Sequence, residues 1–290
     1  MADLAVRRPR RSGAVRRVVA SDHFTGWAFV TPGVVIILLF GAVPIVWSAV
    51  MSFQRNNLLS PSTPFVGLAN YRQMARDPVV AQAIQHTLVY TALFVPGAMI
   101  VGLFLAVAMN RQIRFISVYR TAAFATMAIS TISEAIVFIW LFDPSYGVVN
   151  YFLSRVGVPQ QQFLNSPSEA LFVIAAMTIW GWTGFAVVIY LAALQAIPQS
   201  LLEAAAIDGA GPWRTFRRIT LPLLSPASLF LAVWLTINAL QLFDEVYLST
   251  QGGPLNATTV LVYYLYNQAF SSSTSATRPR SPTSCSSSSS

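Results

Sequence analysis

Few side chains of this 290-residue chain could carry out covalent or metal-assisted chemistry. Cys285 is the single cysteine, which excludes an internal disulfide and a cysteine-based metal cluster. The two histidines, His23 and His86, stand far apart in the sequence and offer no paired metal ligands. The phosphate-binding pattern GxxxxGK(S/T) does not occur, so this chain cannot hydrolyse ATP through such a loop. The remaining candidates are polar groups that bind a solute or a partner.

Polar side chains inside long apolar stretches are the candidates for solute binding, because they are costly within a membrane. Glu134 could accept hydrogen bonds from substrate hydroxyls, or it could be a neutral carboxyl packed against another helix. Asn238 and Gln241 share a helix face, where amides suit hydroxyl-rich ligands but also hold helices together. Trp182 could stack on a sugar ring or simply lie at the membrane interface. These four residues form the predicted substrate pathway.

The most polar internal stretch, 199–222, carries acids, arginines, glycines and prolines between two long apolar runs. Its first part, 199–207, consists of good helix formers, and Asp208–Gly209 should end that helix. Gly211–Pro212 predicts a turn, after which a second helical turn follows and Pro222 opens the next apolar run. We expect a helix–turn–helix along one membrane face, able to contact a partner protein or lipid.

The elements that position these groups are predicted to be membrane helices. The chain is 55% hydrophobic and only 10% charged, whereas soluble domains carry about 25% charged residues. Backbone polar groups in lipid must be satisfied within the segment, which makes helix the default. The fold class is therefore an all-α polytopic membrane protein.

Five stretches are long and apolar enough to cross a bilayer, which takes about 20 mainly apolar residues. The five predicted spans are 26–53, 86–109, 119–142, 170–196 and 221–243.

The arginines predict the orientation of these spans. Twelve of the 18 basic residues, all of which are arginines, lie in the arm 1–25, the link 110–120 and the segment 197–220. Alternation across five spans puts all three regions on one side, which the positive-inside rule assigns to the cytoplasm. The N-terminus is therefore predicted to be cytoplasmic. The net charge of +8 does not indicate nucleic acid, because no basic patch is interleaved with aromatic residues.

The C-terminal residues 271–290 are rich in serine and cannot cross a bilayer. One interpretation is a disordered tail. The other is a shift of reading frame that has replaced the start of a sixth span. Both interpretations limit the transmembrane domain to 26–270.

Several residues of the 199–222 stretch follow a known pattern in type and spacing. The stretch resembles the EAA motif of binding-protein-dependent ABC importer permeases. In that family the motif forms a coupling helix, which docks in a cleft of the cytoplasmic ATPase subunit. The resemblance implies an ATPase-coupling role for Glu203, Ala204, Ala205, Asp208, Gly209, Ala210, Phe216, Ile219 and Pro222.

Other stretches, at 65–74, 140–153 and 243–266, resemble the MalF/UgpA-like branch, which imports carbohydrates and glycerol phosphates. The resemblance covers 26–270 and implies a type I importer permease fold, whose sixth span would be absent or truncated here. It implies three partners: a second permease subunit completing a heterodimer, a dimer of cytoplasmic ATPase subunits, and an extracytoplasmic solute-binding protein. ATP and magnesium would belong to the ATPase, with no cofactor on this chain. The location implied is the bacterial inner (plasma) membrane.

The substrate stays open between two classes. No arginine lies deep in a predicted span, which favours a neutral sugar or polyol, or a phosphodiester whose charge the partner permease handles. The similarity of EAAAIDGAGP to glycerol-phosphate permeases points the other way. Two rival functions are weaker: a membrane enzyme would need clustered catalytic groups beyond Asp244–Glu245, and an ion-coupled transporter would need paired charges beyond Glu134. We therefore predict a non-catalytic permease subunit of an ATP-driven importer.

Overall fold

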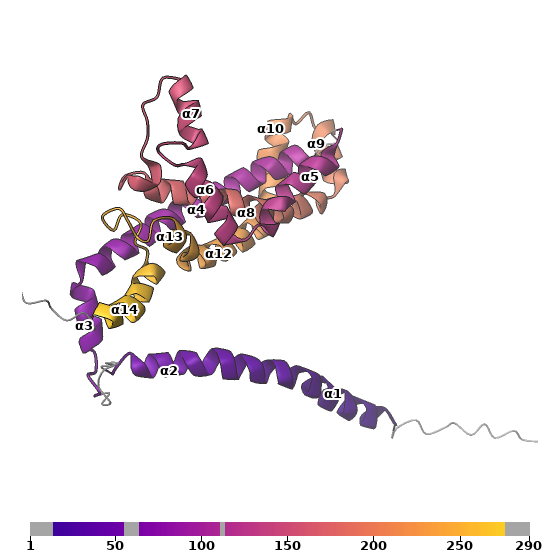
Figure 1. The fold of residues 1–290 in the computed structure, drawn as a ribbon. Coiled ribbons are helices and arrows are strands. Elements are labelled where there is room, and N and C mark those ends of the chain that lie inside the picture. The colour runs from indigo at the N-terminus through magenta and orange to yellow at the C-terminus, as the bar shows by residue number, and fades with distance from the viewer. Residues whose placement is uncertain (1–13, 55–63, 111–113, 276–290) are drawn as a thin grey trace, which may run out of the picture. The chain divides into compact units, whose positions relative to one another are not determined.

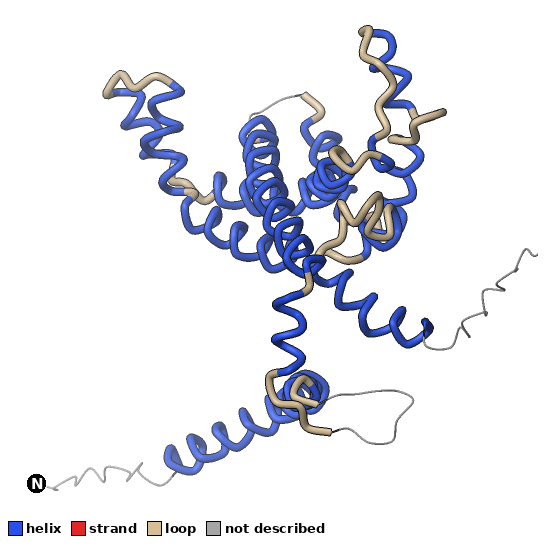
Figure 2. Tube along the Cα trace, turned by 90° about the vertical axis from the view of Figure 1, so that its left-hand side faces the viewer, coloured by secondary structure: helices blue, strands red, loops and turns tan. Residues whose placement is uncertain are grey.

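The computed structural model describes residues 14–54, 64–110 and 114–275 (Figure 1). Within these ranges the regular elements are helices, and the one β-type contact is an isolated bridge between Gln54 and Phe65 (Figure 2). The all-α prediction is therefore confirmed. The chain divides between Arg76 and Asp77 into two compact units.

The first unit contains one long apolar helix and one short polar helix. The long helix runs through α1 (Ala14–Ile37), η1 (Leu38–Ala42) and α2 (Val43–Met51), and the short one is α3 (Ala69–Arg76). Its stretch Gly26–Met51 is long and apolar enough to cross a membrane, and none of that stretch is buried in the structure. A helix that is apolar all round needs lipid or another protein around it, as the first predicted span requires.

The start of this helix differs from the prediction. The helix begins at Ala14 rather than near residue 26, so the last part of the predicted arginine-rich arm is helical. Residues 14–25 contain no proline, and a helix already begun adds each further residue at little cost. The remainder of the arm, 1–13, lies outside the described residues.

The second unit is built around two long helices, α4 (Pro78–Met109) and α8 (Ala170–Gln195). Glycines let them approach closely, as is usual for membrane helices. A methyl group on Gly102 would lie 2.4 Å from Cβ of Ala186, and one on Gly97 would lie 2.5 Å from Cδ1 of Ile179. The buried core lies along this seam and includes Tyr90, Phe94, Ile174, Met177 and Tyr190.

Helix α4 begins earlier than the predicted start at residue 86. Asp77 caps it, since the carboxylate of Asp77 accepts a hydrogen bond from the backbone N–H of Val79 at 2.9 Å. Pro78 occupies the first helical position, where its missing N–H costs nothing. Pro96 lies inside the helix without interrupting it.

The third and fifth predicted spans are each bent instead of continuous. In the third span, the chain bends by 104° between α5 (Ile116–Ala125) with η2 (Thr126–Ala128) and α6 (Thr131–Leu141). In the fifth span, it bends by 61° between the segment formed by α10 (Pro212–Thr215), η4 (Phe216–Thr220) and α11 (Leu221–Leu223) and the helix α12 (Ser225–Leu240). Three helices are long enough to span alone, and counting each bent pair as one span gives up to five. The prediction of five spans agrees with this upper count.

A specific cap causes the first bend. Ser130 has extended backbone angles, and its hydroxyl accepts a hydrogen bond from the backbone N–H of Ser133 at 3.3 Å. A serine in this role starts a new helix and separates it from the previous one. The break therefore places residues 129–134 at the point where the span changes direction.

Shorter helices complete the second unit: α7 (Val148–Arg155), η3 (Phe163–Asn165), α9 (Gln199–Ile207), α13 (Asp244–Ser249) and α14 (Leu261–Ser275). Helix α14 is tied to the start of α4, because Oη of Tyr264 donates to Oδ2 of Asp77 at 2.6 Å. It continues to Ser275, so the helix includes the first part of the predicted serine-rich tail. The rest of that tail, 276–290, lies outside the described residues.

Candidate functional site

The predicted coupling stretch has the helix–turn–helix form expected from its sequence. α9 ends at Asp208, and Gly209 follows with a φ of 69°, in the left-handed region that glycine adopts without strain. The N–H of Ala210 donates to the carbonyl of Ala205 at 2.9 Å, and that of Gly209 to Ala206 at 3.1 Å. This pair of bonds is a Schellman motif. The Asp-Gly-Ala sequence therefore terminates α9 and turns the chain towards α10.

Helix α9 of this stretch exposes several apolar side chains. Ala205 is buried against the protein, whereas Leu201, Leu202 and Ile207 are exposed. Glu203 is exposed too, and it forms no ion pair among the described residues. An exposed apolar patch of this kind next to a free carboxylate is typical of a surface that binds another protein.

A helical connection joins this surface to the membrane core. Phe216 and Ile219 lie in η4, and Pro222 lies in α11. The two helices follow each other directly, and α11 ends next to Leu224. Leu224 is fully buried and packs in a cluster with residues of α4 and α8. The span bends at Leu224, and Pro222 lies two residues before the bend. Movement of α9 would be passed through this connection to α12.

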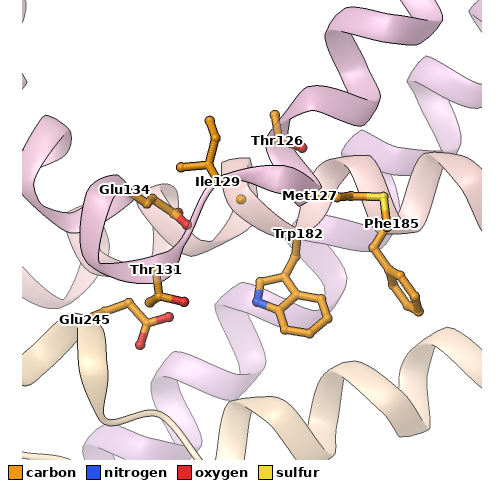
Figure 3. Close-up of a pocket in the computed structure, with 9 residues that line it drawn as sticks. Thr126, Met127, Ile129, Thr131, Glu134, Trp182, Phe185 and Glu245 are labelled. Atoms are coloured by element: carbon orange, nitrogen blue, oxygen red, sulfur yellow. The ribbon is translucent and has the colours of Figure 1, made fainter.

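A cavity of about 220 Å³ lies at the bend of the third span (Figure 3). Four parts of the chain form its wall: η2 with the residues after it, α6, α8 and α13. The lining residues are Thr126, Met127, Ile129, Thr131, Glu134, Gly181, Trp182, Phe185 and Glu245.

The cavity is acidic and offers hydroxyl groups. Glu134 lies in the first turn of α6 and is only 8% exposed, and its Oε1 has no hydrogen-bond partner among the described residues. Glu245 comes from α13, and Thr126 and Thr131 add hydroxyls. No basic side chain is among the described lining residues. Such a wall accepts hydrogen bonds from a ligand and disfavours a negative charge.

An aromatic cluster holds the remaining wall of the cavity. The ring of Trp182 meets Phe94 edge-on at 6.4 Å and Phe185 edge-on at 5.8 Å between centroids. Phe185 in turn stacks with Trp234 of α12 at 6.0 Å. These contacts fix the indole of Trp182 in the wall of the cavity that Glu134 also lines, and they connect the cavity to α12.

The four predicted pathway residues fall into two groups. Glu134 and Trp182 line the same cavity, although they belong to different spans. Asn238 does not line it, and its amide donates to the carbonyl of Trp234 within α12 at 2.8 Å. Gln241 is exposed at the end of α12 and does not line it either.

Sequence reasoning did not identify Glu245, Phe185, Thr126, Thr131 or Gly181 as site residues. Glu245 follows the fifth predicted span and looked like part of an outer loop. Helix α13 packs against α6, which brings this carboxyl to the cavity. A second acid directly after an apolar span was the one signal in the sequence that could have indicated it.

Comparison with known proteins gives concordant similarities. Residues 98–277 match the family described as binding-protein-dependent transport system inner membrane component. The lactose transport system permease protein LacF of Rhizobium radiobacter is 38% identical over 252 residues, which are 84% of this chain and 83% of that protein. The sn-glycerol-3-phosphate transport system permease protein UgpA of Yersinia pestis is 36% identical over 236 residues, which are 81% of this chain and 79% of that protein.

A solved structure shares the fold. It is a crystal structure of a bacterial ABC transporter involved in the import of the acidic polysaccharide alginate. One of its chains superposes with a TM-score of 0.77 at 25% sequence identity, over 89% of this chain and 88% of that chain. The overall arrangement of helices in this chain is therefore one already seen in a transporter.

Proposed function

Because this chain belongs to the family of binding-protein-dependent transport system inner membrane components, we propose that it moves an uncharged, hydroxyl-rich solute through the cavity lined by Glu134 and Trp182. The chain is a multi-pass permease subunit of an ABC importer and not itself an enzyme. The observation that carries the substrate proposal is a buried carboxylate oxygen that has no hydrogen-bond partner among the described residues. It lies in a cavity that an indole also lines and whose described lining residues include no basic side chain.

The chemistry of the cavity fits a sugar or polyol. Carboxylate and threonine oxygens accept hydrogen bonds from hydroxyl groups, and an indole offers an apolar face to the ring of a sugar. A phosphate would bring negative charge next to two carboxyls in a site of low dielectric constant, which is unfavourable. Similarity to LacF, a lactose permease, supports this class, and similarity to UgpA supports the phosphorylated alternative.

We propose that the surface of α9 docks on a cytoplasmic ATPase subunit, which binds ATP and magnesium. The exposed Leu201, Leu202 and Ile207 would fill an apolar cleft, and the Schellman turn at Gly209 would set the angle at which α9 is presented. The other proposed partners are a second permease subunit and a solute-binding protein on the outer side. In this arrangement the N-terminus and α9 face the cytoplasm, which the arginine distribution supports.

The contacts suggest how docking is coupled to the cavity. When the ATPase subunits close, α9 and the connection through η4 would shift α12 about the bend at Leu224. Trp234 on α12 would then move Phe185 and Trp182, which form the cavity wall. Access to Glu134 would thus depend on the state of the ATPase.

The experiment is ATPase stimulation in the reconstituted complex with its cognate binding protein. The ligand panel contains neutral mono- and disaccharides, glycerol 3-phosphate and glycerophosphodiesters. We expect a neutral sugar or polyol to stimulate hydrolysis, and Glu134→Leu to abolish that stimulation. Stimulation by a phosphorylated ligand alone would contradict the proposed substrate class.

A further inference from the structure

A second hollow lies apart from the cavity at Glu134, between α4 and the segment that follows α9. Its volume is about 600 Å³. The residues that line it are Ile100, Leu103, Phe104, Val107, Pro212, Trp213 and Phe216. All of these side chains are apolar, so the hollow is an apolar groove, and the transport function proposed above does not use it.

The groove is built from two parts of the chain that are distant in sequence. Leu103 and Val107 form its floor, because both pack on the buried cluster that contains Tyr190 and Leu224. Phe104 and Trp213 stand on either side of it and are each 72% exposed. Trp213 is held by the ring of Phe216, which stacks on it at 5.8 Å between centroids. The groove is thus a defined concave surface with aromatic sides.

The position of the groove corresponds to one leaflet of the bilayer. Its α4 residues lie between Ile100 and the end of that helix at Met109. At 1.5 Å per residue this distance is about 13.5 Å, which is a little less than half of a hydrocarbon core about 30 Å thick. The end of α4 leads into an arginine-bearing link, and the arginine distribution assigns this side to the cytoplasm.

Positive charge gathers next to one end of the groove. Arg214, Arg217 and Arg218 are interleaved with the lining residues Trp213 and Phe216, and all three are exposed. Arg217 stands four residues after Trp213, so it projects from the same side of the helical segment. Among the described residues, none of the three arginines has an acidic partner or a side-chain hydrogen bond. The surface formed by the groove and the three arginines is therefore apolar at one end and positively charged at the other.

We propose that this groove binds an anionic phospholipid of the cytoplasmic leaflet, with one acyl chain between Phe104 and Trp213 and the phosphate on the arginines that follow Trp213. The charge of the arginines selects this occupant over a zwitterionic lipid, because a basic side chain near the membrane surface attracts anionic headgroups. The aromatic residues lie at the depth where indole rings favour the interface. The lipid would lie against the segment that connects α9 to α12.

The test is native mass spectrometry of the complete transporter complex, titrated with dioleoyl phosphatidylglycerol and, separately, dioleoyl phosphatidylcholine. We expect one phosphatidylglycerol molecule to bind more tightly than phosphatidylcholine. The double variant Arg214→Gln/Arg217→Gln should weaken phosphatidylglycerol binding about thirty-fold, from about fivefold per basic residue, and leave phosphatidylcholine binding unchanged. Phe104→Ala should weaken binding of both lipids, because it removes a wall of the groove.

Arg155→Gln is the matched control, since it removes an exposed arginine from α7 and should leave lipid binding unchanged. Equal binding of the two lipids by the wild-type complex would overturn the proposal, because the arginines would then not select the headgroup. Binding of neither lipid would overturn it too and would indicate that protein covers the groove. Loss of the ATPase subunit from the double variant with phosphatidylglycerol still bound would overturn it as well, because the arginines would then serve ATPase docking. The readout is lipid mass, so the result does not depend on the transported solute.

Discussion

The carboxyl of Glu134 occupies the space that a side chain at Gly181 would need: a methyl group on Gly181 would lie 2.5 Å from Oε2 of Glu134. The absence of a side chain at Gly181 of α8 thus leaves room for the carboxyl of Glu134, which lies just after the break in the third span and lines the cavity. This relationship joins residues of two spans, and it determines where the carboxyl points.

Gly181→Ala should therefore reduce transport without preventing assembly. The methyl group would displace the end of the flexible Glu134 side chain, a change that costs little stability but moves the hydrogen-bond acceptor. We expect uptake to fall about tenfold, as for the loss of one hydrogen bond to a substrate. Uptake of labelled solute by proteoliposomes measures this, with Gly33→Ala as control, because a methyl group there contacts nothing within 4 Å. Equal uptake by both variants would show that the carboxyl position does not matter.

Substitution of Glu134 separates the hydrogen-bonding role of this residue from its charge. Glu134→Gln keeps an acceptor of the same shape, so uptake of a neutral substrate should stay within about threefold of the wild type. Glu134→Leu removes every acceptor and should lower uptake about tenfold or more, since substrate hydroxyls would lose their partner. Both variants are compared at equal amounts of assembled complex. Wild-type uptake by the leucine variant would exclude Glu134 from the substrate pathway.

The turn after α9 is tested at Gly209, whose left-handed backbone disfavours a β-branched residue by about 1–2 kcal/mol. Gly209→Val should distort the Schellman turn and weaken ATPase association about tenfold. Gly209→Asn is the matched control, because asparagine tolerates left-handed angles. Co-purification of the ATPase subunit with each variant gives the comparison. If valine and asparagine behave alike, the turn geometry is not what the ATPase requires.

The close approach of α4 and α8 makes a prediction about stability. Gly102→Ala would place its methyl group 2.4 Å from Cβ of Ala186 and should destabilise the second unit by about 1–3 kcal/mol. The double variant Gly102→Ala/Ala186→Gly exchanges the two side chains across the seam and should recover part of that loss. Thermal unfolding in detergent reports both effects. No recovery in the double variant would place the cause of instability elsewhere.

The contact between Asp77 and Tyr264 predicts a pH dependence. The hydrogen bond from Tyr264, followed by that from the backbone of Val79, lowers the pKa of Asp77 below its ordinary value of 3.8. A lowered pKa stabilises the folded state above the unfolded-state value, and this contribution disappears as the pH falls through the folded-state pKa. Tyr264→Phe should therefore destabilise the protein at neutral pH and bring its stability closer to the wild type below pH 3.8. A constant difference across this range would mean that Asp77 ionisation is not involved.

The sequence by itself determined the elements whose physics is local. Long apolar runs must form helices in lipid, and so five spans could be placed, three of them as long helices. Good helix formers followed by Asp208 and Gly209 specify a helix that ends in a left-handed turn, whatever surrounds it. The coupling role of that stretch stays a prediction, because it depends on a resemblance to a known motif and not on local helix physics.

Only the tertiary structure decided the bends and the composition of the cavity. Apolar composition does not show whether a run is straight, and the third predicted span is interrupted where Ser130 caps a new helix. Glu245 reaches Glu134 through the packing of α13 on α6, whereas Asn238 turns back to its own helix. Such contacts depend on how segments that are distant in the sequence pack together, and the hydropathy and residue spacing of a single chain do not predict this packing.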